Sequence, residues 1–313
     1  MEIKNITVAG GGVLGSQIAL QSAYKGFSVT MWLRSEGAIE RAKPKLERLR
    51  TIYKQTLEAM KTDPAAYCRG LADSPDVSAA TIDQLIGHVD RAFDDITLTT
   101  DLQEAFGDTD LVIEAIAEII DEKDAFYSSI RDILPQRTIL CTNSSTLLPS
   151  AMMGFTGRED RFLALHFANN IWKNNTAEVM GAPKTSEESY KAVVEFARAI
   201  GMIALELKKE QPGYLLNSML VPFLNSAEAL LANGVADVET IDAAWTLGTG
   251  APLGPFRILD IVGLTTAYNI VAASPAAQDP DSTAGRIAAV LKKHIDEGKT
   301  GINAGEGFYK YDK

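Results

Sequence analysis

The sequence predicts an α/β fold, in which a parallel sheet with crossover helices is followed by a separate all-helical domain. Two observations support this prediction. In the N-terminal part, short apolar and β-branched runs alternate with stretches of helical periodicity, an order typical of parallel sheets. After Gln211-Pro212-Gly213 the strand-like runs stop, and only helical patterns follow. We therefore expect one domain at residues 1–205 and a helical domain at residues 206–313.

Each expected element has its own apolar pattern. The expected strands cover residues 6–9, 27–33, 96–98, 111–116, 138–141, 162–167 and 176–180. The expected helices of the second domain cover residues 215–231, 238–247, 257–271 and 284–297. Segment 38–93 is longer than one crossover requires, and Pro64, Gly70 and Pro75 interrupt its helical spacing. Two interpretations of it stay open, an excursion that covers a ligand and a helical pair packed on the sheet edge.

The composition argues against several classes of protein. Among 313 residues, 41 are acidic and 30 basic, which gives a formal net charge of −11. A chain that neutralises nucleic-acid phosphates usually carries a basic excess, so nucleic acid is not an expected partner. The two cysteines are far apart without metal-type spacing, which indicates a reducing, cytoplasmic setting and no metal site. No signal peptide or apolar run of about 18 residues is recognisable, so we expect no membrane segment.

A glycine-rich segment, Gly10 to Gly15, follows an apolar strand and opens a helix, which is the context of a dinucleotide-binding turn. Gly10 allows the tight turn, Gly12 lets the backbone approach a pyrophosphate, and Gly15 permits close packing of helix on strand. The unpaired N–H groups of the helix start, with Val13 and Leu14 among them, suit phosphates. The segment predicts a Rossmann-like dinucleotide-binding domain; a glycine turn without ligand is the alternative.

The end of the second strand bears on the choice of cofactor. An acid there would hold the ribose 2′-hydroxyl of NAD, but the position is occupied by Leu33. Arg34 and Ser35 follow, a cation and a hydroxyl that suit a 2′-phosphate, so the sequence favours NADP(H). In the alternative, Glu36 accepts the ribose hydroxyl and the cofactor is NAD(H). Further candidate cations for phosphate groups are Lys43, Lys45 and Lys54.

The chain contains three histidines, and one of them has the position of a general base. His88 and His294 lie in polar helical or loop surroundings and are expected at the surface. His166 ends strand 162–167, and in an open α/β sheet that end faces the ligand crevice. Glu178 lies twelve residues on, in the next strand, whose pairing would bring its carboxylate to the imidazole. A structural histidine at a strand end is the alternative.

Taken together, these motifs resemble those of the L-3-hydroxyacyl-CoA dehydrogenase family, which includes bacterial 3-hydroxybutyryl-CoA dehydrogenases. The resemblance covers nearly the whole chain. Its ordered segments are the glycine turn, 113–118 with Lys123, 142–147, 160–167, the interval from His166 to Glu178, 211–217 and 305–311.

The resemblance implies an oxidoreductase that interconverts a short-chain L-3-hydroxyacyl-CoA and the 3-ketoacyl-CoA with NAD(P). It implies that His166 and Glu178 act as the acid–base dyad, and that Ser145 and Asn217 donate hydrogen bonds to the substrate. The residues that it implies beside the cofactor are Glu118, Lys123 and Asn143. It also implies a homodimer formed through the helical domain.

The segment after His166 departs from the family pattern. Where the family has His-Phe-Phe-Asn-Pro, this chain has Ala168 and Asn170, which leave a roomier and more polar site that Trp172 is expected to refill. The leading alternative is therefore a dehydrogenase of a free hydroxy acid, similar to the gulonate and carnitine dehydrogenases. A dinucleotide-binding protein without turnover is a second alternative, and Ser145 has an alternative role as a helix N-cap.

Overall fold

The computed structural model describes residues 2–311, which form two compact units, one ending at Leu215 and the other beginning at Leu216. Each unit has its own hydrophobic core. The boundary predicted at 205/206 runs through β8 (Ile203–Leu207), which pairs with β7 (Thr176–Gly181) in the sheet. The chain therefore leaves the sheet later than the sequence indicates. None of the helices within residues 2–311 is long and apolar enough to cross a membrane.

An eight-stranded sheet forms the centre of the first unit, in the order β3-β2-β1-β4-β5-β6-β7-β8. The remaining strands are β1 (Asn5–Ala9), β2 (Ser28–Trp32), β3 (Thr97–Thr99), β4 (Leu111–Glu114), β5 (Ile139–Thr142) and β6 (Phe162–Phe167). All neighbours are parallel except β6 and β7. The seven predicted strands are confirmed. The sequence does not reveal β8 because most of this edge strand is only partly buried, so its apolar pattern is weak.

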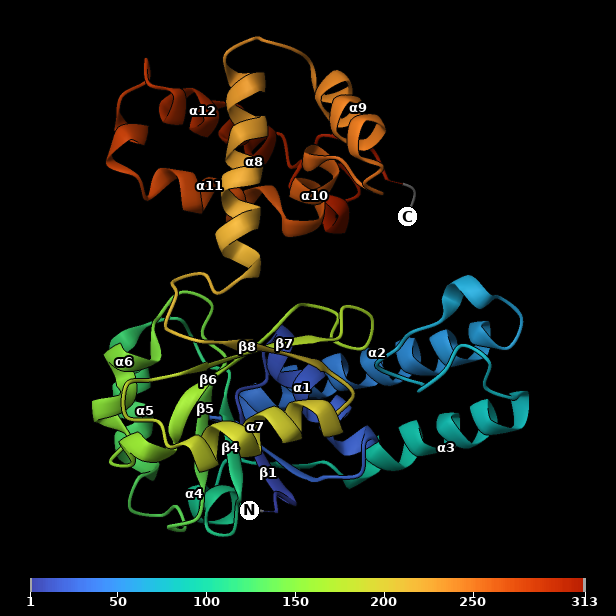
Figure 1. The fold of residues 1–313 in the computed structure, drawn as a ribbon, viewed down its shortest axis with the longest axis vertical. Coiled ribbons are helices and arrows are strands. Elements are labelled where there is room, and N and C mark those ends of the chain that lie inside the picture. The colour runs from blue at the N-terminus through green and yellow to red at the C-terminus, as the bar shows by residue number, and fades with distance from the viewer. Residues whose placement is uncertain (1, 312–313) are drawn as a thin grey trace. The chain divides into compact units, whose positions relative to one another are not determined.

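Helices cover both faces of the sheet (Figure 1). Alternate strand residues point to opposite faces, so Leu111 and Ile113 join the core on one face and Val112 joins the core on the other. The helices that pack on the face of Leu111 are α1 (Val13–Tyr24), α2 (Glu36–Met60), α3 (Ala79–Asp95) and α7 (Glu187–Ala199). The helices that pack on the face of Val112 are α4 (Leu102–Phe106), α5 (Ile120–Ile130) and α6 (Pro149–Met152). This arrangement confirms the predicted α/β architecture.

Segment 38–93 forms a helical pair, α2 and α3, that packs against α1. A buried hydrogen bond from the Tyr53 hydroxyl to Gln21 Oε1, 2.8 Å long, joins α2 to α1. Trp172 packs on the Tyr53 ring with centroids 5.3 Å apart, and Gly70 N–H donates to the Trp172 carbonyl. The expectation that Trp172 refills the site after His166 is therefore wrong, since its indole is buried in this core.

The second unit is entirely helical, as predicted, with a small core of its own. Its helices are α8 (Leu216–Ala232), α9 (Val238–Thr249), α10 (Pro255–Val262), α11 (Leu264–Ala272) and α12 (Thr283–Asp296). The single helix expected at 257–271 is two helices, because Gly263 adopts φ +93° and ends α10. A backbone conformation that glycine alone adopts easily thus separates α10 from α11.

Segment 305–311, the last of the segments that resemble the family, folds onto two buried carboxylates. Asp260 accepts hydrogen bonds from the backbone N–H groups of Phe308 and Tyr309 and from the Tyr311 hydroxyl. Asp242 accepts one from the Tyr309 hydroxyl, 3.0 Å long. The aromatic residues of this segment therefore anchor it to α9 and α10, which gives the segment a structural role.

Glu228 of α8 is buried in the helical unit, and within residues 2–311 its Oε1 atom has no hydrogen-bond partner. Burial raises the pKa of this carboxyl to about 7. An unfolded chain holds a glutamate near its ordinary pKa of about 4.3. The stability that the protonated carboxyl contributes is therefore fully present below about pH 4.3 and is lost as the pH rises through about 7.

We expect Glu228→Gln to gain stability over the wild type as the pH rises, because the amide cannot ionise. Between pH 5 and pH 8 the difference in unfolding free energy should grow by about 2.5 kcal/mol in favour of the variant. Urea unfolding at both pH values measures it. Glu239→Gln, which changes an exposed glutamate of the same unit, should show no such growth. A difference that stays constant with pH would show that Glu228 does not titrate in this range.

Candidate active site

The glycine turn has the geometry that a pyrophosphate requires. Gly10 adopts φ +115°, and a Cβ there would lie 2.5 Å from the Ala115 carbonyl oxygen. A Cβ on Gly15 would collide with the Gly10 carbonyl, so both glycines allow the close packing that the sequence predicts. Gly12 has open space where its Cβ would be, and α1 begins at the next residue without a side-chain cap. The first N–H groups of α1 are thus left for an anionic ligand.

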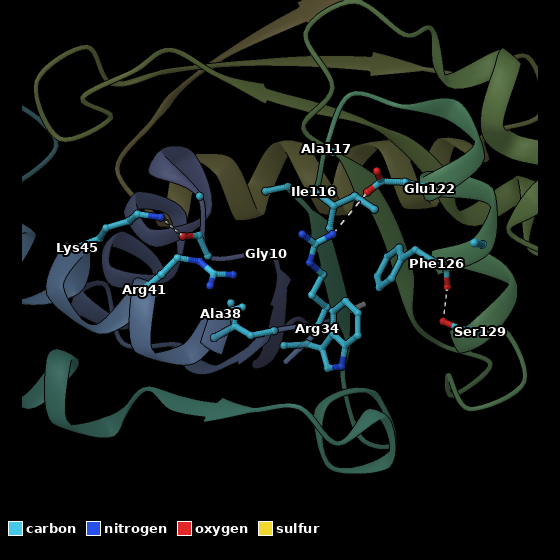
Figure 2. Close-up of a pocket in the computed structure, with 16 residues that line it drawn as sticks. Gly10, Arg34, Ala38, Arg41, Lys45, Ile116, Ala117, Glu122, Phe126 and Ser129 are labelled. Carbon is cyan, nitrogen blue, oxygen red and sulfur yellow. Dashed lines mark hydrogen bonds and ion pairs between the residues drawn. The ribbon is translucent and has the colours of Figure 1, made fainter. Parts of the chain in front are cut away.

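A cavity of about 560 Å³ lies beside the glycine turn (Figure 2). Three cationic side chains line it, those of Arg34, Arg41 and Lys45. Arg34 has a side chain 74% exposed, and its Nη1 atom lies 3.9 Å from Glu122 Oε2. Lys45 donates a 2.7 Å hydrogen bond to the Gly11 carbonyl. The basic lining and the open glycine turn fit a bound dinucleotide.

The other predicted phosphate ligands of this region have different surroundings. Ser35 is the N-cap of α2, where its hydroxyl accepts a hydrogen bond from Ala38 N–H. Lys43 and Lys54 pair with Glu40 and Asp90 and do not line the cavity. Arg41, which the sequence did not indicate, lies in the second turn of α2 and lines the cavity.

The predicted contact between His166 and Glu178 is present. The two residues are register partners on the antiparallel strands β6 and β7, and His166 Nδ1 lies 2.9 Å from Glu178 Oε2. Both are buried, and the second carboxylate oxygen accepts a 2.8 Å hydrogen bond from Leu215 N–H. With Nδ1 directed at a carboxylate, the imidazole keeps Nε2 for a substrate. His88 is exposed, and His294 Nδ1 lies 2.9 Å from the Val290 carbonyl.

Tyr214 lies against this pair and was not indicated by the sequence. Its ring stacks on the His166 imidazole with centroids 4.5 Å apart and planes at 17°. Its hydroxyl donates a 2.7 Å hydrogen bond to the Ser144 carbonyl. Tyr214 has φ +53°, a left-handed conformation that costs a tyrosine about 1–2 kcal/mol. Burial raises the pKa of the phenol, so the hydroxyl stays a neutral donor.

Glu118 organises the turn that follows β5. Its Oε1 atom accepts hydrogen bonds from the backbone N–H groups of Ser145 and Thr146, 3.0 and 2.9 Å long, and from the Ser144 hydroxyl. Burial raises the pKa of Glu118, but these hydrogen bonds outweigh it and hold that pKa below its ordinary value. Ser145 is not a helix N-cap, since α6 begins after Leu148 without a side-chain cap. The alternative role for Ser145 is therefore wrong.

Lys123 is fully buried and is not among the residues that line the cavity. Its Nζ atom donates a 2.6 Å hydrogen bond to Glu114 Oε1 and lies 3.6 Å from Glu118 Oε2. Glu114, equally buried, also accepts hydrogen bonds from the Tyr127 and Thr142 hydroxyls. Lys123 thus contacts two carboxylates, and one of them, Glu118, holds the turn after β5.

Asn143 and Asn217 belong to different units. The Asn143 side-chain oxygen accepts a 3.1 Å hydrogen bond from Phe167 N–H, which links the ends of β5 and β6. Asn217 lies in the first turn of α8 in the helical unit. Its contact with substrate stays a prediction from the family resemblance.

Comparison with known proteins identifies the family. A family model described as the NAD-binding domain of 3-hydroxyacyl-CoA dehydrogenase matches residues 5–211, and the model of its C-terminal domain matches residues 213–311. The chain belongs to the 3-hydroxyacyl-CoA dehydrogenase family. It is therefore an oxidoreductase that uses a nicotinamide dinucleotide, as the glycine turn predicts.

Three relatives illustrate the range of the family. The human mitochondrial hydroxyacyl-coenzyme A dehydrogenase is 32% identical over 310 residues, which cover 99% of this chain and 91% of that protein. A solved (S)-3-hydroxybutyryl-CoA dehydrogenase from Ralstonia eutropha is 25% identical with a TM-score of 0.77, and all of both chains is covered. A solved diketoreductase that acts on dicarbonyl compounds is 49% identical, with a TM-score of 0.86. The match covers 99% of this chain and 100% of that chain.

Proposed function

We propose that this dehydrogenase interconverts a short-chain L-3-hydroxyacyl-CoA, such as 3-hydroxybutyryl-CoA, and its 3-ketoacyl-CoA. The observation that carries the proposal is the buried His166–Glu178 pair at the end of β6, with Nε2 left for a substrate. The family and the human and bacterial relatives support CoA thioesters as the substrate class.

In the direction of reduction, protonated His166 donates its Nε2 proton to the oxygen that forms on C3 of the substrate. In oxidation the neutral imidazole accepts the hydroxyl proton at the same nitrogen. The Glu178 carboxylate accepts the Nδ1–H hydrogen bond and stabilises the imidazolium. Ser145 and Asn217 donate hydrogen bonds to substrate oxygens, where negative charge develops. The chemistry that the bound cofactor supplies is hydride transfer at C4 of its nicotinamide.

Reduction of acetoacetyl-CoA, followed in parallel with NADH and NADPH, tests the substrate and the cofactor together. The proposal expects oxidation of the reduced cofactor that depends on the thioester. Binding of cofactor without turnover of any keto substrate would contradict it and favour a binding protein.

A second candidate function is reduction of a free dicarbonyl compound or oxidation of a free hydroxy acid. Two observations favour it. The identity to the diketoreductase, 49%, exceeds the 32% identity to the human CoA enzyme. The loop after His166 also exposes the polar residues Lys173 and Asn174 where the family pattern is apolar. The values of kcat/KM for acetoacetyl-CoA, acetoacetate and 2,4-pentanedione decide between the candidates.

We further propose that the cofactor is NADP(H), with Arg34 and Arg41 as the ligands of its 2′-phosphate. Both side chains point into the cavity beside the glycine turn (Figure 2). Leu33 stands where an NAD-specific acid would be, and it packs on Ile39 under α2. Glu36, the alternative ribose acceptor, does not line the cavity. These observations favour a phosphate over a free ribose hydroxyl.

We expect Arg34→Ala with Arg41→Ala to lower the ratio of kcat/KM for NADPH over NADH by about 10²-fold. One charged hydrogen bond contributes about 1.5–3 kcal/mol, which corresponds to about 10-fold or more for each arginine. Lys43→Ala is a matched control on the same helix, because Lys43 pairs with Glu40 and should leave the ratio unchanged. A wild-type preference for NADH would overturn the proposal.

Two further features of the chain are proposed. Homodimerisation through the helical unit is supported by its large exposed apolar side chains, which include Leu216, Met219, Leu230, Leu247, Ile261 and Ile270. Sedimentation velocity measures the oligomeric state. A cytoplasmic or other reducing setting is supported by two free, buried thiols, Cys68 and Cys141.

A further inference from the structure

Two consecutive residues, Tyr214 and Leu215, contact both members of the dyad. The Tyr214 ring stacks on the face of the His166 imidazole, 4.5 Å between centroids. The Leu215 N–H donates to Glu178 Oε1, while Glu178 Oε2 faces His166 Nδ1. The dyad is therefore held along its edge by one strand pair and across its face by a segment that follows Pro212 in sequence.

The same segment reaches the turn that carries the predicted substrate ligand. The Tyr214 hydroxyl donates 2.7 Å to the Ser144 carbonyl, and Ser144 immediately precedes Ser145. One side chain thus contacts both the acid–base group and the backbone that presents a substrate hydrogen-bond donor. A shift of Tyr214 would move the two together.

The backbone of Tyr214 supports a specific role. Gly213 and Tyr214 both have positive φ, +76° and +53°, and the second is a bulky side chain that rarely adopts this conformation. Such a conformation persists only when several contacts determine it together, and residues of this kind cluster at functional sites. Here the contacts are the ring stack, the hydroxyl bond and the adjacent N–H bond to Glu178.

We propose that Tyr214 is a positioning residue for the dyad, holding the imidazolium of His166 against an aromatic face and coupling it to the Ser144 turn. This inference rests on the proposed roles of His166 and Glu178. A cation over an aromatic face is stabilised by the electron-rich ring, so the stack favours the protonated imidazole that reduction requires. In this role Tyr214 acts through His166, on which its ring stacks.

The test replaces Tyr214 with phenylalanine and with pentafluorophenylalanine by amber suppression. The two rings have nearly the same shape, but fluorination withdraws electron density from the face. Titration of the His166 imidazole by NMR in enzyme labelled at its three histidines gives the readout, with His166→Gln assigning the signal. We expect the midpoint for pentafluorophenylalanine to lie about 0.5–1 pH unit below that for phenylalanine.

Turnover gives a second readout. The alkaline limb of kcat for reduction should move to lower pH in the fluorinated variant. Tyr214→Phe should keep the limb and raise KM for the keto substrate several-fold, because the bond to the Ser144 carbonyl is lost. Tyr24→Phe is a matched control, since it removes a buried 2.7 Å hydroxyl bond to the Leu71 carbonyl outside the site.

The outcomes separate this inference from the proposed function. Equal NMR midpoints for the two aromatic variants would overturn the inference, whatever the turnover, because the ring would then only fill space. An imidazole midpoint that shifts in an enzyme inactive on every keto substrate would support the inference and reject the function. The NMR readout needs no substrate, and it compares two planar six-membered rings of the same outline, of which the fluorinated one is somewhat larger.

Discussion

His166→Gln should lower kcat by about 10²–10⁴-fold while the Kd of the cofactor stays nearly unchanged. The reason is chemical, since glutamine can hydrogen-bond but cannot exchange a proton near neutral pH. The substituted side chain is buried next to Glu178, whereas the cavity beside the glycine turn is lined by other residues. Single-turnover reduction of acetoacetyl-CoA with fluorescence titration of the reduced cofactor measures both quantities.

His88→Gln is the matched control for this prediction. His88 is exposed on α3, so its replacement should leave kcat within experimental error of the wild type. Full activity of the His166 variant would refute its assignment as acid–base group. A loss of cofactor binding equal to the loss of kcat would instead place His166 in the binding of the dinucleotide.

The contact between His166 and Glu178 was predictable because the two residues lie on strands that are neighbours in the sequence and pair in the sheet. Two apolar runs separated by a polar loop form an antiparallel pair, and the register places residues at matching positions side by side. His166 and Glu178 are such a pair. The glycine turn was predictable for a similar reason, because its steric demands at Gly10 and Gly15 exclude other side chains.

Other features depend on packing between segments that no local pattern relates. Tyr214 takes a left-handed conformation that tertiary contacts impose against its local preference. Trp172 is a residue of the polar loop, yet its ring is buried against Tyr53 of a distant helix. Arg41 reaches the cavity only because α2 begins where it does, at Glu36 after the Ser35 cap. Sequence periodicity alone predicts none of these contacts.

Lys123→Met should destabilise the nucleotide-binding unit by about 3–5 kcal/mol, the cost of leaving a buried charge without its partner. Lys123 and Glu114 have no exposed side-chain surface, and their 2.6 Å contact is surrounded by core residues of β4 and α5. Removal of the ammonium leaves the carboxylate with hydrogen bonds from the Tyr127 and Thr142 hydroxyls and Ile116 N–H, which are neutral donors. Neutral donors do not compensate a full buried charge.

Urea unfolding measures this effect in a Trp245→Phe background, where the remaining fluorescence comes from Trp32 and Trp172 of the first unit. Lys43→Met, which breaks an exposed ion pair on α2, should change the unfolding free energy by less than about 1 kcal/mol. If Lys123→Met also lowers the unfolding free energy by less than about 1 kcal/mol, the buried ion pair does not stabilise the first unit.

Glu114→Gln combined with Lys123→Met should recover much of the lost stability, because both buried charges are then absent. It should not recover activity to the same extent. Lys123 also lies 3.6 Å from Glu118, whose carboxylate holds the turn that presents Ser145. Without the Lys123 ammonium, the Glu118 carboxylate lacks this cation and no longer holds the turn in one geometry. The KM for the keto substrate should therefore stay raised even though stability is restored. A double variant with wild-type KM would confine Lys123 to a structural role.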